Sequence, residues 1–399
     1  MIRATPAYIG FTWGRNVGDQ CAHRGAELAL GRRLALVPRT HTAHRIVRLR
    51  PHSTRRGLLV LGGGTLIGRA GWIERVARTT ALLQPAARVV FGTGVECAVD
   101  GRPSELSDAG EREAWIRWLT DADVVAVRGH HSAAMLASWG IPSIVVGDPA
   151  FYLRSVSAPL PQAKRADVAV MSISTHEVAW GGQPADKLAV YADLCHYLFE
   201  RGLRVQLLVM DPKDLEPSLW LRELVPSGML SIRNANGRLD LVISAIRKSS
   251  IAIGARLHLS IMAAALATPC VQFAYRPKSY DAMSVLAHDL PTIRNDLVDT
   301  TSVPAASQEC SIIGRSIIAA SWTMSTRYSR SDVVHSATFS AAGWIARQIS
   351  GERDDHRPRC LCRYARERQS VIVERRIRSR GVPLGARDRK RMVQRRGSR

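Results

Sequence analysis

The stretch SIAIGARLHLSIMAAALATPCVQFAYRPKSYD, residues 250–281, decides the fold. Its apolar residues 251–253 predict a buried strand that ends at Gly254, where the lack of a Cβ permits a sharp turn. Residues 256–267 are good helix formers and apolar on most sides, so they predict a buried helix. Residues 270–275 predict a second strand, which a basic loop follows. The stretch therefore predicts a strand–helix–strand unit with a basic loop at its end.

Three basic side chains interrupt this apolar stretch. Arg256 and His258 lie in the first turn of the predicted helix, where free backbone N–H groups and the helix dipole favour an anion. Lys278 follows the next strand and can face the same crevice. Together the three predict a binding site for a negatively charged ligand. The structural alternative is that Arg256 pairs with a carboxylate and His258 is a hydrogen-bonded core histidine.

Apolar strands that end in glycine or polar residues alternate with helices along the rest of the chain. The predicted strands are residues 7–10, 57–61, 88–91, 124–127, 144–146, 168–173 and 205–209. The predicted helices are residues 21–30, 72–83, 111–119, 185–200 and 240–247, with one more that ends at Trp139. This alternation predicts parallel sheets covered on both faces, with the loops that bind ligands all on one edge.

A proline-containing segment, residues 155–164, interrupts the alternation, which then restarts. With 399 residues the chain is also too long for one core. We therefore expect two doubly wound, Rossmann-like α/β domains, residues 1–152 and 166–350, with a cleft between them. Residues 344–349 predict a helix that closes the second domain or crosses back to the first.

Residues 351–399 predict a basic, largely disordered tail. From residue 352 onward there are 17 Lys or Arg against 6 Asp or Glu, so a net +11 of the chain's +22 lies here. A sustained apolar period is missing from most of this segment, which is typical of disorder. Such a tail can bind RNA or an anionic membrane surface, although a solvated appendage is the favoured interpretation. The body lacks the aromatic and basic strand face that stacks bases, so no specific nucleic acid is expected.

The cysteines and the N-terminus predict a cytoplasmic protein. The seven cysteines are odd in number and scattered, which is typical of reduced thiols. The first residues lack the basic-then-apolar order of a secretory signal, and no apolar run is long enough for a membrane span. In the alternative in which the basic tail binds an anionic surface, the protein would lie at the inner face of the cell membrane.

Several short motifs follow the predicted strands in a fixed order. They are Asn16-Val17-Gly18-Asp19, Gly62-Gly63-Gly64, Arg128 with Ser132 and Leu136, Gly140-Ile141, Gly147-Asp148-Pro149-Ala150-Phe151, Arg256-Leu257-His258 and Tyr275-Arg276-Pro277-Lys278. In order and spacing, over about residues 8–290, the chain resembles the polysaccharide pyruvyl transferases of bacteria and fungi. The resemblance implies a two-domain, glycosyltransferase-like (GT-B-like) fold, with the acceptor on the N-terminal domain and the donor on the C-terminal one.

The resemblance also implies a reaction. Family members transfer pyruvate from phosphoenolpyruvate to sugar hydroxyls as a ketal, in the synthesis of cell-surface polysaccharides. The expected partners are therefore phosphoenolpyruvate and a sugar or lipid-linked oligosaccharide. No cofactor and no metal ion are expected. The Asp-x-Asp pattern at residues 121–123 falls before a strand, at the edge opposite the ligand loops, and predicts a solvated turn.

The resemblance assigns roles to particular residues. Arg256 matches the motif that binds the donor anion, and His258 matches a residue for acid–base work or for the leaving phosphate. Asp19 either accepts a proton from a sugar hydroxyl or caps the helix that begins near Gln20. The expected substrate-binding residues are Arg256, Lys278, Arg128, Asn16, Gly63, Gly64 and His176.

The assignments of His176 and of the two glycines, Gly63 and Gly64, need explanation. Many family members carry an arginine after the first strand of the second domain, where this chain has Ser172 to Glu177. His176 is the residue expected to take that place. Gly63 and Gly64 either let the backbone approach a ligand or form a tight strand-to-helix turn.

The alternative function is a GT-B-type glycosyltransferase that uses a nucleotide sugar, and a less favoured one is a nucleic-acid-binding protein that acts through the tail.

Overall fold

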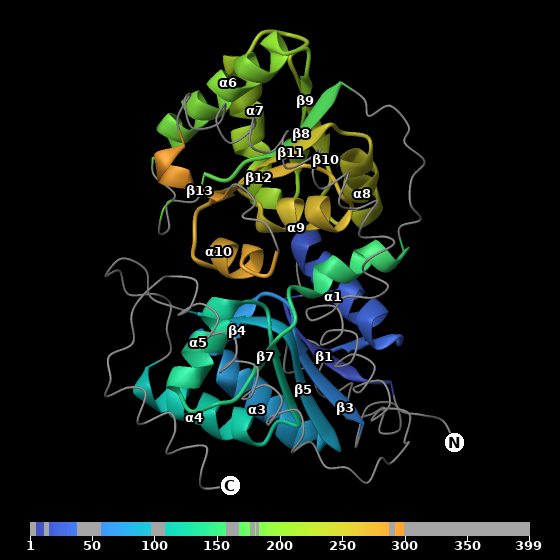
Figure 1. Ribbon diagram of the computed structural model, residues 1–399, viewed down its shortest axis with the longest axis vertical. Helices are drawn as coiled ribbons and strands as arrows, with labels where there is room; N and C mark the ends of the chain where they lie inside the picture. Colours follow the sequence, from blue (N-terminus) through green and yellow to red (C-terminus); the bar gives the residue numbers. More distant parts are fainter. Residues whose placement is uncertain are drawn as a thin grey trace, which may run out of the picture. The chain divides into compact units, whose positions relative to one another are not determined.

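The alternating strands assemble into two sheets in which every paired strand is parallel to its neighbour. In this computed structural model the described residues are 5–11, 16–37, 57–96, 108–156, 167–175, 180, 183–286 and 292–298. All of them belong to one compact unit, Met1–Gly351 (Figure 1). The expected fold class, two doubly wound α/β sheets, is confirmed.

The first sheet has the strand order β2-β1-β3-β5-β6-β7, and β4 pairs with β5. Its strands are β1 Ala7–Ile9, β2 Ala35–Leu36, β3 Leu58–Gly62, β4 Thr65–Ile67, β5 Ala87–Val95, β6 Val124–Val127 and β7 Ile144–Val145. Its helices are α1 Val17–Leu30, α3 Trp72–Leu83, α4 Ala109–Thr120, α5 His130–Ser138 and the 3₁₀ helix η1 Pro149–Val156. The strand order reverses between β1 and β3, which is where doubly wound sheets bind ligands.

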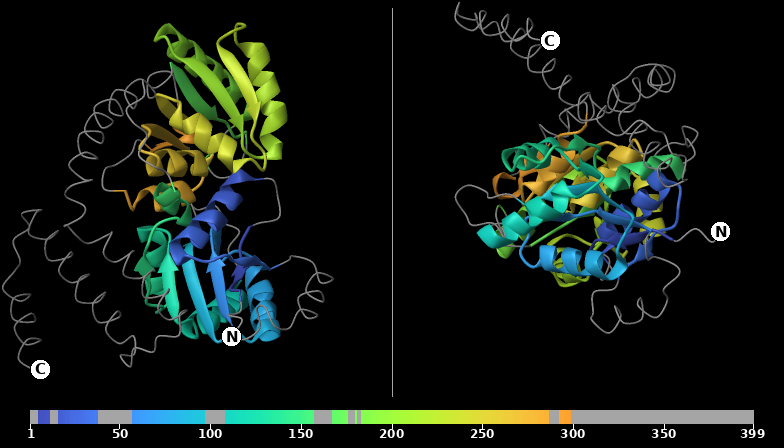
Figure 2. Two further views of the ribbon diagram at one scale, coloured as in Figure 1. Left: turned by 90° about the vertical axis from the view of Figure 1, so that its right-hand side faces the viewer. Right: turned by 90° about the horizontal axis from the view of Figure 1, so that it is seen from below.

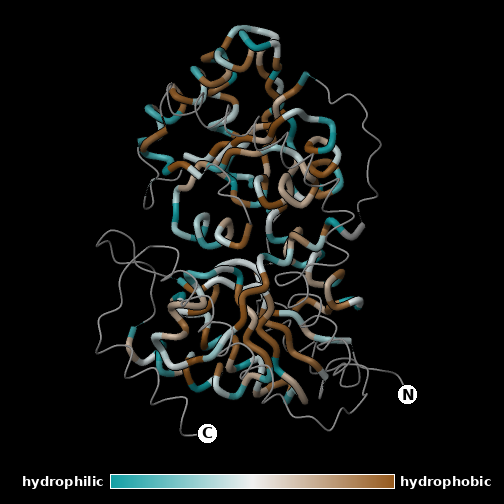
Figure 3. Tube along the Cα trace, viewed as in Figure 1, coloured by the Kyte–Doolittle hydropathy of each residue, from teal (hydrophilic) through white to brown (hydrophobic). Residues whose placement is uncertain are grey.

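Helices cover both faces of the first sheet. On one face α3, α4 and α5 bury Ile73, Trp115 and Leu136 against the strands. On the other face α1 buries Ala26 and Leu30. The central strands of this sheet are hydrophobic along most of their length (Figure 3). Strand β3 is buried at every position, as expected for a strand with helices on both faces of its sheet.

The second sheet has the strand order β10-β9-β8-β11-β12-β13. Its strands are β8 Val168–Ser172, β9 Arg204–Val209, β10 Leu230–Asn234, β11 Ile251–Gly254, β12 Cys270–Ala274 and β13 Thr292–Arg294. Its helices are α6 Pro184–Glu200, α7 Leu215–Leu224, α8 Leu239–Arg247, α9 Leu257–Ala265 and α10 Lys278–Met283, with the 3₁₀ helices η2 Pro212–Asp214 and η3 Asn295–Leu297. Counted from β8, this is the Rossmann order, and its switch point lies between β8 and β11.

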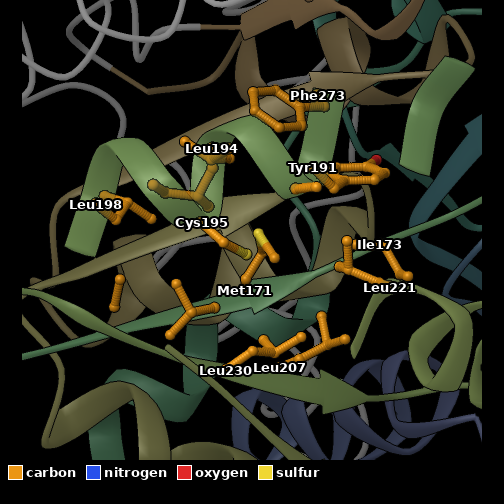
Figure 4. Close-up of a cluster of buried hydrophobic side chains, with 14 of the residues drawn as sticks. Met171, Ile173, Tyr191, Leu194, Cys195, Leu198, Leu207, Leu221, Leu230 and Phe273 are labelled. Carbon is orange, nitrogen blue, oxygen red and sulfur yellow. The ribbon is translucent and has the colours of Figure 1, made fainter. Parts of the chain in front are cut away.

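The two faces of the second sheet carry different kinds of core. On one face α6 and α7 enclose Met171, Tyr191, Leu207 and Phe273 with other buried side chains (Figure 4). On the other face α8 and α9 pack with residues of α1 and η1, which belong to the first half of the chain. Helix α1 therefore contacts α9 as well as its own sheet (Figures 1 and 2).

Three local features differ from the sequence expectation. Helix α1 begins at Val17 rather than near Cys21, because the Asn16 side chain caps it by accepting from Gly18 N. Helix α9 begins at Leu257, so Arg256 is its N-cap residue rather than part of its first turn. Lys278 begins the short helix α10 instead of lying in a loop.

Several expectations lie outside the described residues. They concern His176, most of the expected linker, the expected helix at residues 344–349 and the basic tail at 351–399. The expected domain limits, 1–152 and 166–350, stay predictions. Among the helices of the described part of the chain, none is both long and apolar enough to cross a membrane.

Candidate functional site

The loops that follow the strands of both sheets open into one cavity of about 220 Å³. Seven of the nine residues expected at the site line it: Asn16, Asp19, Gly64, Arg128, Arg256, His258 and Lys278. They come from the segments after β1, β3 and β6 in one sheet and after β11 and β12 in the other. Gly63 is not among the lining residues, although its positive φ of 71° suits the tight turn that was its structural alternative.

The first turn of α1 is fixed by the loop that follows β9. Asn16 Nδ2 donates to Asp211 Oδ2 at 2.8 Å, and Val17 N donates to Met210 O at 3.1 Å. Asn16 Oδ1 accepts from Gly18 N at 2.8 Å. The cap of the helix is therefore Asn16, and the expectation that Asp19 caps a helix beginning near Gln20 is wrong.

Asp19 lies in the first turn of α1 and lines the cavity. Burial raises the pKa of its carboxyl to about 7; Lys278 and Arg256 oppose the rise, whereas Asp211 and Asp148 add to it. At neutral pH the carboxyl is therefore close to its titration midpoint. A group of this kind can take a proton from a hydroxyl or give one back.

Arg256 combines a carboxylate partner with a place on the cavity wall. Its Nε donates to Asp214 Oδ2 at 2.8 Å and its Nη2 donates to Asp214 Oδ1, while Nη1 lies 3.9 Å from Asp211 Oδ2. Burial opposes the charge, but Asp214, Tyr275 and Asp211 carry the pKa of Arg256 above its ordinary value. The guanidinium group of Arg256 is therefore always positively charged and is held in one position. Because a guanidinium has five N–H donors, the pair with Asp214 leaves others to face a ligand.

His258 lies in the first turn of α9 with its ring against the first turn of α1. A Cβ on Gly18 would come within 2.3 Å of His258 Nδ1, so the ring occupies the space that glycine leaves. Burial lowers the pKa of His258, Asp148 raises it, and Lys278 and Arg128 lower it further. Among the described residues His258 Nε2 has no hydrogen-bond partner, which is unlike a satisfied core histidine.

Lys278 donates from Nζ to Tyr275 Oη at 2.8 Å. Burial raises the pKa of the Tyr275 phenol, but Lys278 and Arg256 outweigh it, so the pKa lies below its ordinary value. Sequence reasoning used Tyr275 only as a landmark, although Tyr275 lines the cavity together with Arg256 and Lys278.

Arg128 is buried and bonded on two sides. Its Nε and Nη2 donate to Asp281 Oδ2 at 3.3 and 3.2 Å, and Nη2 also donates to Thr65 Oγ1 at 3.1 Å. Ser132 adds two more donors to Asp281, from Oγ at 2.7 Å and from N at 3.0 Å. These contacts give Arg128 a place in the structure beside its expected role in substrate binding, which stays a prediction.

Sequence reasoning missed the acidic residues around the cavity. Asp211 and Asp214 hold Asn16 and Arg256, and Asp281 holds Arg128. Asp211 and Asp214 follow directly on the predicted strand at 205–209, a position that could have drawn attention to them. Within the described residues no three His, Cys, Asp or Glu side chains are grouped as metal ligands would be.

Comparison with known proteins identifies the family. The family model described as polysaccharide pyruvyl transferase matches residues 39–277, more than half of the chain. A search of curated protein sequences finds no match.

Solved structures of several enzymes resemble the structure of this chain. A putative UDP-N-acetylglucosamine 2-epimerase from Listeria monocytogenes is 11% identical over 90% of this chain and 99% of its own, with a TM-score of 0.53. A UDP-GlcNAc 2-epimerase from Methanocaldococcus jannaschii is 10% identical over 77% of this chain and 92% of its own, with a TM-score of 0.49. An E. coli ADP-heptose heptosyltransferase II is 15% identical over 78% of this chain and 99% of its own, with a TM-score of 0.35. At 11% identity and a TM-score of 0.53 the likeness to the Listeria protein concerns the fold alone, and that fold is of the expected GT-B-like class.

Proposed function

Because the chain belongs to the polysaccharide pyruvyl transferase family, we propose that it transfers pyruvate from phosphoenolpyruvate to two hydroxyls of a sugar. The product is a pyruvate ketal, and phosphate is released. The observation that carries the proposal is the convergence of Asp19, Arg256, His258 and Lys278 on one cavity. They supply two groups for proton transfer and two fixed cations for a ligand that carries a carboxylate and a phosphate.

The cations bind and orient the donor. Arg256 is held by Asp214 and presents its remaining N–H groups to the donor's carboxylate or phosphate. Lys278 faces the same cavity from α10 and binds as a point charge. His176, which lies outside the described residues, stays a candidate for the same anion.

The two proton-transfer groups act in sequence. The His258 imidazolium protonates the methylene carbon of the donor, which leaves positive charge on the central carbon. A sugar hydroxyl attacks that carbon and Asp19 takes its proton. The bond between the central carbon and the phosphate oxygen then breaks as Asp19 returns the proton to the leaving phosphate. The second sugar hydroxyl attacks the same carbon, and His258 takes the proton of that hydroxyl. Atoms and charge balance, because the two hydroxyl protons replace those given to carbon and to phosphate.

The acceptor is a sugar or a lipid-linked oligosaccharide, bound on the side of the cavity formed by the first sheet. Phe11 and Gly64 line the cavity on this side. A Cβ on Gly64 would come within 2.7 Å of the Phe11 ring, so glycine lets the ring lie against the backbone. The Arg69 guanidinium lies over the same ring, 5.2 Å from its centroid, and also lines the cavity, so this side offers an apolar and a cationic group to the acceptor.

The test is an assay of the purified full-length protein with phosphoenolpyruvate and a panel of lipid-linked and nucleotide-linked sugars. We expect phosphate release in equal amount to a ketal product identified by mass spectrometry. His258→Gln should cut turnover by roughly 10²–10⁴-fold with a smaller change in donor affinity. Binding of a nucleoside diphosphate, with none of phosphoenolpyruvate, would instead indicate a glycosyltransferase.

A further inference from the structure

Two buried polar atoms face each other where η1 packs against α9. Asp148 Oδ2 lies 3.7 Å from His258 Nε2, and among the described residues neither atom has a hydrogen-bond partner. Asp148 is wholly buried. A buried carboxylate oxygen without a partner is costly, so its position next to an imidazole N–H requires an explanation.

The local chain fixes Asp148 in this position. It follows Gly147, whose φ of +83° favours glycine, and it precedes Pro149, which begins η1. Its Oδ1 accepts from Ala150 N at 3.0 Å, so one oxygen serves the backbone and the other points at His258. Helix η1 packs against both α1 and α9, which holds the carboxylate beside the imidazole.

The opposite side of the ring is fixed as well. Gly18 leaves room for the Nδ1 side of His258, and both residues line the cavity. The ring therefore has its Nε2 toward a buried carboxylate and its Nδ1 toward the first turn of α1. Lys278 from α10 and Arg128 from the loop after β6 also act on the ring, and both oppose its positive charge. Asp148 acts in the other direction.

We propose that Asp148 is the positioning residue of His258. It accepts the Nε2–H, which fixes the neutral ring as the Nε2–H tautomer, and it stabilises the imidazolium when the ring is protonated. The separation of 3.7 Å is longer than a hydrogen bond, and a shift of less than about 1 Å would close it. Nδ1 is then the atom that carries the transferred proton. The role of this proton in catalysis rests on the proposed function. The tautomer of His258 follows from its position next to Asp148 and does not depend on the proposed function.

The experiment is nitrogen NMR of histidine labelled with ¹⁵N in the full-length protein, with His258→Gln to identify the signals of His258. Wild-type protein should show the Nε2–H tautomer at neutral pH. In Asp148→Asn the amide oxygen can still accept from Ala150 N, while the NH₂ faces Nε2 and donates to it. This variant should therefore show the Nδ1–H tautomer and a His258 pKa below that of wild type.

A matched control and a kinetic measurement complete the test. Asp281→Asn changes another buried carboxylate at the cavity and should leave the His258 tautomer unchanged. Asp148→Asn should lower kcat by roughly 10²–10⁴-fold with little change in the donor KM, and should move the alkaline limb of the rate profile to lower pH.

An Nδ1–H tautomer in wild type, or an unchanged tautomer and pKa in Asp148→Asn, would overturn the inference. If Asp148→Asn does not fold, the wild-type tautomer alone decides. A tautomer switch in a protein that shows no pyruvyl transfer would support the pairing and refute the proposed function, so the two failures are distinguishable.

Discussion

Arg128 and Asp281 form a buried ion pair, with Arg128 Nη2 3.2 Å from Asp281 Oδ2 and both side chains almost wholly inaccessible. Arg128 follows β6 of the first sheet, and Asp281 lies in α10 beside the second. The contact is tight on the backbone side too, since a Cβ on Gly129 would come within 1.9 Å of Asp281 O. The ion pair thus joins residues 153 positions apart in the sequence, and both of them line the cavity.

Breaking this ion pair should lower the free energy of unfolding. Arg128→Ala leaves Asp281 buried without its charged partner, so we expect a loss of about 3–5 kcal/mol of stability in urea unfolding. The control is Asp121→Ala, which removes an exposed partner of Arg88 and should stay within about 0.5 kcal/mol of wild type. Equal losses for the two variants would show that the buried pair does not stabilise the contact between α10 and the loop after β6.

The raised pKa of Asp19 predicts a pH-dependent stability. Its folded pKa of about 7 exceeds the unfolded value, so folding takes up a proton between about pH 4 and pH 7. Stability falls as pH rises across that window, and the penalty is complete above pH 7. Asp19→Asn should therefore stabilise the protein by roughly 1–3 kcal/mol at pH 8 and have little effect near pH 4.

Asp211 provides the opposite case on the neighbouring loop. Burial raises its pKa, but Lys213 N, Arg256 and Asn16 outweigh burial, so the pKa lies below its ordinary value. Its contribution to stability is present above the unfolded pKa and lost as pH falls. Asp211→Asn should therefore destabilise the protein at pH 8. Thermal melts of both variants across pH would contradict the assignment if the two changes had the same sign.

Asp19 also predicts the acid limb of the rate. If Asp19 accepts a hydroxyl proton, the carboxylate is the active form, so kcat/KM should rise with pH through about 7. Asp19→Asn should remove most of the activity. A wild-type profile that stays flat from pH 6 to pH 8 would argue against Asp19 as the base.

Gly18 should not tolerate even a methyl group. Gly18→Ala places a Cβ 2.3 Å from His258 Nδ1, so the ring must move and turnover should fall at least about tenfold. The matched control is Gly110→Ala, which also changes the second residue of a helix and meets only Asp108 Oδ1 at 3.4 Å. It should leave activity unchanged. Comparable activity in the two variants would place His258 outside the reaction.

The fork of Arg256 should matter more than its charge. Arg256→Lys keeps the charge and loses the paired N–H geometry, so phosphoenolpyruvate affinity should fall roughly ten- to a hundredfold by calorimetry. Asp214→Asn weakens the ion pair that holds the Arg256 guanidinium in place, and should also lower the affinity for phosphoenolpyruvate. Glu223→Gln, on the exposed side of α7, is the control and should bind the donor as wild type does. Wild-type affinity in Asp214→Asn would mean that Asp214 does not position the arginine.

The sequence by itself determined the fold and most of the candidate site. Apolar runs ending at glycine or polar residues locate nine of the thirteen strands in the described part of the chain, because buried parallel strands need apolar side chains on both faces. The carboxyl ends of such strands lie at one edge of the sheet. From this rule alone the sequence predicted that Arg256, His258 and Lys278 lie close together, and all three line the cavity. Short or partly exposed elements such as β2, β4 and α10 escaped because their periodicity is too brief to detect.

Only the tertiary structure decided how the charges are paired. Asp214 lies 42 residues from Arg256, and Asp281 lies 153 residues from Arg128, so no local pattern links them. Likewise, the contact between Asp148 and His258 exists because η1 packs on α9, and the role of Gly18 appears only where the imidazole fills its missing side chain. Pairing between distant side chains depends on how helices pack, and periodicity along the chain carries no information about that packing.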